Sequence, residues 1–110
     1  MIELKIKPLS VNDAWQGRRF KTERYKSYTK TVLFLLPTIK LPEPPYTLIM
    51  EYYFSNPLSD VDNPCKPLQD ILAKKYKFND RDIKLLIQHK KDIVDKGDEK
   101  ILIKIPYQFL

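Results

Sequence analysis

The first residues of the chain alternate between hydrophobic and charged side chains. Residues 2–7 read IELKIK, which places the aliphatic side chains on one side of an extended segment. A period of two is typical of a half-buried strand. Pro8 ends this strand, because proline has no backbone N–H to donate to a sheet. Residues 8–22 are rich in small polar side chains and cations, which predicts a long basic loop.

The next segment changes to a helical period. From Thr22 or Ser27 to Leu36, hydrophobic residues recur every three or four positions, and Pro37 follows. This spacing predicts a helix whose hydrophobic face consists of Tyr25, Tyr28, Val32, Leu35 and Leu36.

A second helix is predicted from Pro67 to Tyr76, with a hydrophobic face made of Leu68, Ile71, Leu72 and Tyr76. Its start has two readings. Asp62 or Asn63 is able to cap a helix with Pro64 in its first turn, but Pro67 would then remove a backbone donor near the second turn.

Three further segments have the pattern of strands. Residues 46–54 are hydrophobic on both sides, which predicts a central strand buried on both faces. Residues 83–94 predict a long strand, one face of which carries Ile83, Leu85 and Ile87. Residues 95–98, in which Gly97 is free to adopt a positive φ, predict a hairpin turn into a last strand at 101–107.

The order β-α-β-α-β-β in 110 residues predicts a single α/β (α+β) domain spanning 1–110, with a mixed four-stranded sheet and two helices. No hydrophobic run approaches the ~20 residues of a membrane span, and no secretory signal is visible at the start, so we expect a cytoplasmic protein without a membrane partner. One cysteine and one histidine disfavour a zinc site within one chain.

Charge adds a candidate partner. The chain has 20 Lys and Arg against 14 Asp and Glu, a net charge of +6. Such a balance favours a polyanion, most often nucleic acid, although it is also ordinary for the solvated surface of a small domain. The cations that we predict to bind DNA are clustered in one stretch that contains a single acid, Glu23: Arg18, Arg19, Lys21, Arg24, Lys26 and Lys30. Trp15 and Phe20 in this stretch would either stack on bases or anchor the loop to the core.

Candidate chemistry lies after the strand at 46–54. In an extended backbone Asp60 and Asp62 would project to the same side, and two carboxylates held close together favour a bound cation. Mg²⁺ commonly takes one or two carboxylates, and Asp80 is a plausible third ligand. A D-x-D pattern alone is more often a turn or a cap. Lys66 is either an ordinary surface lysine or a contact to a scissile phosphate.

As a set, these residues resemble the RusA-type Holliday junction resolvases, a family of crossover junction endodeoxyribonucleases. The resemblance consists of D-x-D-N-x-x-K at 60–66, N-D-x-x-I at 79–83, P-x-S-x-N at 8–12 and G-R-R-x-K-T at 17–22, and it covers essentially the whole chain. Pro64 and Pro67, which flank Lys66, depart from the pattern of the family.

The resemblance implies a small homodimeric endonuclease, often encoded by a phage or prophage, that nicks four-way DNA junctions symmetrically in DNA recombination and repair. It implies Mg²⁺ or Mn²⁺ held by the catalytic carboxylates Asp60, Asp62 and Asp80, with Lys66 as an essential lysine and no small-molecule cofactor. One alternative is a non-catalytic module of the same fold that binds junctions or a phage replication protein. A structural protein with an acidic Ca²⁺ loop is disfavoured, because 60–70 lacks the ligand order of an EF-hand.

A homodimer is also expected from geometry. Two symmetric nicks need two sites, and one chain has one D-x-D and no internal repeat. Large apolar residues are also more numerous than one small core requires, unless they close the ends of the sheet: Tyr52, Tyr53, Phe54, Tyr107, Phe109 and Leu110.

Overall fold

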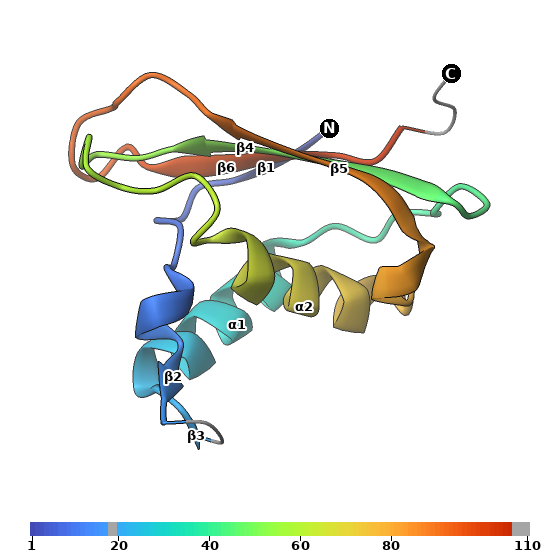
Figure 1. Ribbon diagram of the computed structural model, residues 1–110, viewed down its shortest axis with the longest axis horizontal. Coiled ribbons are helices and arrows are strands. Elements are labelled where there is room, and N and C mark those ends of the chain that lie inside the picture. Colours follow the sequence, from blue (N-terminus) through green and yellow to red (C-terminus); the bar gives the residue numbers. More distant parts are fainter. Residues whose placement is uncertain (18–19, 107–110) are drawn as a thin grey trace.

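The computed structural model describes residues 1–17 and 20–106, and it has a sheet with both of its helices on one face (Figure 1). Within the described residues, the main elements are β1 (Ile2–Leu4), α1 (Glu23–Leu35), β4 (Tyr46–Tyr53), α2 (Cys65–Tyr76), β5 (Ile83–Lys90) and β6 (Lys100–Lys104). The short elements are the 3-10 helices η1 (Val11–Asp13) and η2 (Asp80–Asp82) and the strands β2 (Trp15–Gln16) and β3 (Phe20–Lys21). The predicted α+β class, with a mixed four-stranded sheet and two helices, is confirmed.

The main sheet has the strand order β1-β6-β4-β5. β4 is parallel to β5 and antiparallel to β6, and β1 is antiparallel to β6. The prediction that residues 46–54 form a central strand is therefore confirmed. The predicted hairpin between the last two strands is wrong, because β4 lies between β5 and β6.

The connection from β5 to β6 explains this difference. β5 ends at Lys90, before the predicted Val94, but the Lys91 N–H still donates to the Tyr52 carbonyl at the end of β4 (2.9 Å). A turn then forms, in which the Asp98 N–H donates to the Asp95 carbonyl at 2.9 Å and Gly97 has φ +101°. The predicted turn is therefore present, but the chain beyond it returns to the other side of β4.

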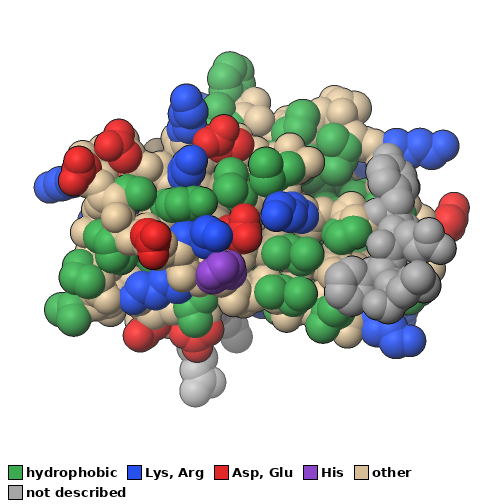
Figure 2. Space-filling view, turned by 90° about the horizontal axis from the view of Figure 1, so that it is seen from above, with side chains coloured by type: hydrophobic (Ala, Val, Ile, Leu, Met, Phe, Trp, Pro, Cys, Tyr) green, Lys and Arg blue, Asp and Glu red, His purple; other side chains and the backbone are tan. Residues whose placement is uncertain are grey.

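The faces of β4 differ in burial. Leu48, Met50 and Tyr52 face the helices and are at most 1% exposed. Ile49 and Glu51 lie on the opposite face and are only partly buried, because no helix covers that side. Figure 2 shows this open face, where hydrophobic side chains lie among lysines and acids. The prediction that the strand is buried on both faces is wrong.

An irregularity in β5 changes which side chains share a face. Tyr46 pairs with Ile83, but Thr47 pairs with Leu85, so one extra residue of β5 lies between them. Such a bulge reverses the alternation of the strand. Ile83 therefore faces the core while Leu85 and Ile87 lie on the open face, and the prediction that all three share one face is wrong.

Helix α1 begins after Thr22, whose Oγ1 accepts a hydrogen bond from the Tyr25 N–H at 3.1 Å. This cap decides between the two predicted starts in favour of Thr22. Of the predicted hydrophobic face, Leu35 is 39% exposed, and the other members are buried: Tyr25, Tyr28, Val32 and Leu36.

Helix α2 begins at Cys65, earlier than predicted, and has no side-chain cap. Pro67 is its third residue. The N–H groups of the first turn have no acceptor inside a helix, so a proline at this position removes no intrahelical hydrogen bond. Leu68, Ile71 and Leu72 are buried against the sheet as predicted.

The predicted long basic loop contains regular structure. η1 is capped by Ser10, whose Oγ accepts from the Asn12 N–H. β2 and β3 then form a small antiparallel hairpin in which Trp15 pairs with Lys21 and Gln16 pairs with Phe20. Two-residue strands carry too little alternation to be recognised from sequence.

The buried carboxylate of Glu99 makes the stability of the fold depend on pH. It accepts hydrogen bonds from Ser55 Oγ (2.8 Å) and from the Gly97 N–H (2.7 Å). Its pKa is lowered from 4.5, chiefly by a hydrogen bond from its own backbone N–H and then by that from Ser55. A lowered pKa in the folded state stabilises the fold fully above the unfolded value, and this stabilisation is lost as the pH falls through the folded pKa.

We therefore expect Glu99→Gln to destabilise the protein more at pH 7 than at low pH. Urea midpoints of both proteins at pH 7 and at about pH 3 measure the effect. The difference between the two proteins should shrink in acid. An equal difference at both pH values would contradict the assignment.

Candidate active site and nucleic-acid interface

Asp60 and Asp62 lie in the connection between β4 and α2. Three contacts fix this connection: the Val11 N–H donates to the Asn63 carbonyl at 2.8 Å, and Lys90 Nζ donates to the carbonyls of Pro57 (2.8 Å) and Ser59 (2.7 Å). Both aspartate side chains are exposed. Their loop is therefore held by η1 on one side and by the end of β5 on the other, while the carboxylates stay accessible.

A cavity of about 230 Å³ lies beside Asp60. Asp60 and Asn63 line it together with Ser10 and Asp13 from the N-terminal segment. The Asn63 Nδ2 group lies 3.5 Å from Asp60 Oδ2, a long contact that leaves most of the hydrogen-bonding capacity of the carboxylate free. The P-x-S-x-N and D-x-D-N segments, far apart in sequence, thus meet at one cavity.

Lys66 joins two acids on the exposed side of α2. Its Nζ lies 2.8 Å from Asp70 Oδ1 and 3.4 Å from Asp80 Oδ2. The side chain is 59% exposed, so a ligand can reach it. Two members of the predicted site, Lys66 and Asp80, are therefore brought together, and the flanking prolines do not prevent this contact.

The pKa of Lys66 is raised, mainly by the hydrogen bond to Asp70. The side chain is therefore an ammonium group at neutral pH. A protonated lysine cannot accept a proton as a general base, but it can offset negative charge on a phosphate.

Sequence reasoning missed two residues at this site. Asp70 lies four residues after Lys66, and this helical spacing was the available signal. Tyr25 from α1 is buried, and its pKa is raised by burial and then by the charge of Asp70. No pattern in the sequence connects Tyr25 with α2, because the two helices are brought together only by the fold.

The three predicted metal ligands do not meet in one centre. Within 1–17 and 20–106, no group of three or more His, Cys, Asp or Glu side chains is placed to hold a metal ion. Residues 61–64 form turns, so the rule that residues i and i+2 of an extended chain share a side does not hold for Asp60 and Asp62. Asp80 instead contacts Lys66. This arrangement does not fit a three-carboxylate metal site.

Comparison with known proteins does not assign the chain to a family. No family model and no curated protein matches the chain. In the part of the chain that the structure describes, no helix is long and apolar enough to cross a membrane. Function must therefore be inferred from the side chains themselves.

The predicted DNA-binding cations lie on the hairpin and α1. Arg18 and Arg19 fall outside the described residues, and the others are exposed: Lys21, Arg24, Lys26 and Lys30. Arg24 Nη1 lies 3.6 Å from Asp13 Oδ2, and Lys26 Nζ lies 3.3 Å from Glu23 Oε1, so acids partly offset two of these charges.

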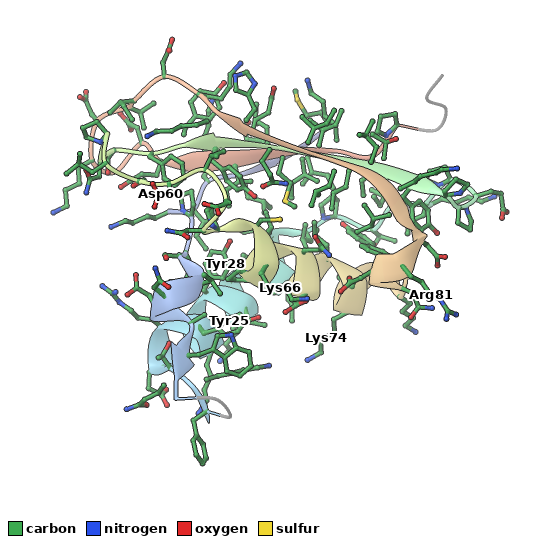
Figure 3. All side chains as sticks on the ribbon, viewed as in Figure 1. Tyr25, Tyr28, Asp60, Lys66, Lys74 and Arg81 are labelled. Carbon is green, nitrogen blue, oxygen red and sulfur yellow. The ribbon has the colours of Figure 1, made fainter. Side chains whose placement is uncertain are left out.

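Helix α2 extends the positive charge. Figure 3 shows Lys66 and Lys74 on the side of α2 away from the sheet, with Arg81 beyond the end of the helix. The predictions did not include Lys74 or Arg81. The hairpin and α2 therefore both carry exposed cations, whereas Lys66 itself is paired with Asp70 and Asp80.

Proposed function

We propose that this protein is an endodeoxyribonuclease that resolves four-way DNA junctions by paired symmetric nicks, in recombination and repair. The observation that supports this best is the meeting of Lys66 and Asp80 at 3.4 Å on an exposed surface. These residues belong to two separate motifs of the resemblance, 60–66 and 79–83. The ammonium group of Lys66 is exposed enough for a phosphate to reach it.

In this proposal each side chain has a role. In the hydrolysis, a water oxygen bonds to phosphorus and gives up a proton to solvent while the P–O bond to the leaving oxygen breaks and that oxygen takes up a proton. Lys66 stabilises the negative charge that develops on the phosphate in this step, and Asp70 and Asp80 hold its ammonium group in place. Asp60 and Asp62 are the other catalytic carboxylates. The motifs suggest that cleavage requires Mg²⁺ or Mn²⁺, and the experiment below tests this requirement.

The test compares labelled four-way junction, linear duplex and single strand, each with and without Mg²⁺ or Mn²⁺. Paired nicks in the junction that require the metal are expected. Asp62→Asn should bind the junction as well as the wild type or better, because it loses a charge that repels phosphate, but it should not cut. Cleavage by this variant at the wild-type rate would contradict the catalytic assignment.

A second candidate function is binding without cleavage, because the predicted metal-binding carboxylates do not form one site. Because Asp60, Asp62 and Asp80 do not form one centre, a non-catalytic module that binds junctions together with a phage replication protein also suits the site. Tight junction binding without cleavage in either metal would support this second function.

Binding should depend on salt through the basic segment. Replacing Lys21 and Lys30 with alanine should make the fall of log affinity with log salt less steep. The slope should shrink in magnitude by up to about 0.9 for each phosphate that these lysines bind in the wild type. Junction titrations at several salt concentrations measure this slope. Lys5→Ala/Lys96→Ala, with the same change of charge outside the segment, is the control. Equal slopes for the wild type and the Lys21/Lys30 variant would mean that these lysines are only solvated.

A homodimer is part of the proposal because two nicks of like polarity need two symmetric sites. The aromatic residues support it less than the sequence suggested. Tyr52 and Phe54 are 0% and 7% exposed in the core of a single chain, and 107–110 lie outside the described residues. Light scattering of the junction-free protein should give twice the mass of one chain, and the mass of a single chain would exclude the dimer.

A further inference from the structure

The hairpin of β2 and β3 presents an uncovered aromatic ring. Phe20 is 71% exposed, whereas Trp15 on the neighbouring strand is 38% exposed. Figure 1 shows the hairpin beyond α1, at the end of the molecule farthest from the sheet. Phe20 therefore does not anchor this segment to the core, which was one of its two predicted roles.

Other residues hold the two strands in place. The Thr22 N–H donates to the Ala14 carbonyl at 3.0 Å, and Thr22 Oγ1 donates to the Asp13 carbonyl at 2.6 Å. The Trp15 ring meets the edge of the buried Tyr25 ring, with centroids 5.7 Å apart. The base of the hairpin is thus attached to α1, and Phe20 is carried on it rather than used to build it.

The hairpin also carries a positive charge on its other face, because Lys21 pairs with Trp15 whereas Phe20 pairs with Gln16. Lys21 Nζ lies 5.3 Å from the Tyr25 ring centroid and 6.0 Å from that of Trp15, which keeps an ammonium group on the hairpin. An exposed aromatic ring on a segment that carries cations is a feature with which proteins bind single-stranded nucleic acid, because every base has a face on which a ring can stack. One ring is far too small an apolar surface for a stable protein interface.

We propose that Phe20 stacks on an unpaired base at a DNA branch point. This inference rests on the proposed function, since it names the part of the DNA that the hairpin contacts. An unpaired base costs little to unstack, whereas a base inside a duplex must first leave its pair. Phe20 therefore favours branched DNA over linear duplex.

The test uses the full chain and a four-way junction with 2-aminopurine at the branch point, together with a linear duplex of the same sequence. Wild-type protein should change the 2-aminopurine emission of the junction. Phe20→Ala should lose this change and bind the junction roughly 5- to 100-fold more weakly, with little loss of duplex affinity. Phe20→Tyr, which keeps an aromatic ring, should restore both signals.

Phe34→Ala is the matched control, because Phe34 is 87% exposed at the other end of α1. It should behave as wild type. If wild-type protein binds the junction and Phe20→Ala binds it equally well, the stacking role is wrong and the proposed function stands. An equal loss on junction and duplex would also overturn stacking, because it would mean a contact to the backbone. Failure of the wild type to bind DNA would overturn the proposed function and this inference with it.

Discussion

Replacing Lys66 with methionine should slow junction cleavage by roughly 100- to 1000-fold, the usual cost of removing one group that stabilises transition-state charge. Methionine keeps much of the length of the side chain and removes its charge. The ammonium group, held 2.8 Å from Asp70 and 3.4 Å from Asp80, is then no longer available to the phosphate. Single-turnover rates with the junction fully bound separate this effect from weaker binding.

Lys74→Met is the control for this prediction. Lys74 is an exposed lysine of the same helix, and the same substitution removes the same charge. It should weaken binding slightly and leave the bound rate unchanged. Lys66→Met should also unfold at nearly the wild-type temperature, because an exposed ion pair contributes at most ~1 kcal/mol to stability. Equal cleavage rates for the two variants would remove Lys66 from the proposed chemistry.

Leu72→Ala should lower the free energy of unfolding by about 2–5 kcal/mol. Leu72 is 0% exposed on the face of α2 that packs against the sheet, so alanine would leave a cavity there. Since small domains are stable by only ~5–15 kcal/mol, this is a large fraction of the total. Urea unfolding followed by circular dichroism measures the loss.

Leu58→Ala makes the same change at a side chain that is 86% exposed. Its effect should stay within about 0.5 kcal/mol, because a side chain this exposed leaves no cavity when it is shortened. Similar losses for both variants would contradict the packing of α2 described above.

The candidate site was predictable only in part. Lys66 and Asp80 were named from their motifs, and the structure brings them together. The pairing of Asp60 and Asp62 was inferred from the geometry of an extended chain, and this premise does not apply because residues 61–64 turn. The effect of the Asp70 charge on the pKa of Tyr25 could not have been found, since these residues lie on different helices, α1 and α2.

Local signals in the sequence determined the secondary structure. The helical spacing from Tyr25 to Leu36, the Thr22 cap and the hydrophobic face of α2 each act within a few residues, so they can be read without the rest of the molecule. The alternation in 46–54 identified a strand rich enough in hydrophobic residues to lie at the centre of the sheet.

Only the tertiary structure decided which strands pair. The turn at 95–98 serves equally well for a hairpin or for a return to the far side of β4, and the choice depends on contacts between segments distant in sequence. The bulge in β5 likewise belongs to the pairing with β4 and to neither strand alone. Thr22 bonds the hairpin of β2 and β3 to Asp13, and Trp15 packs it against Tyr25 of α1. These contacts stabilise the hairpin, because two strands of two residues each are not stable by themselves.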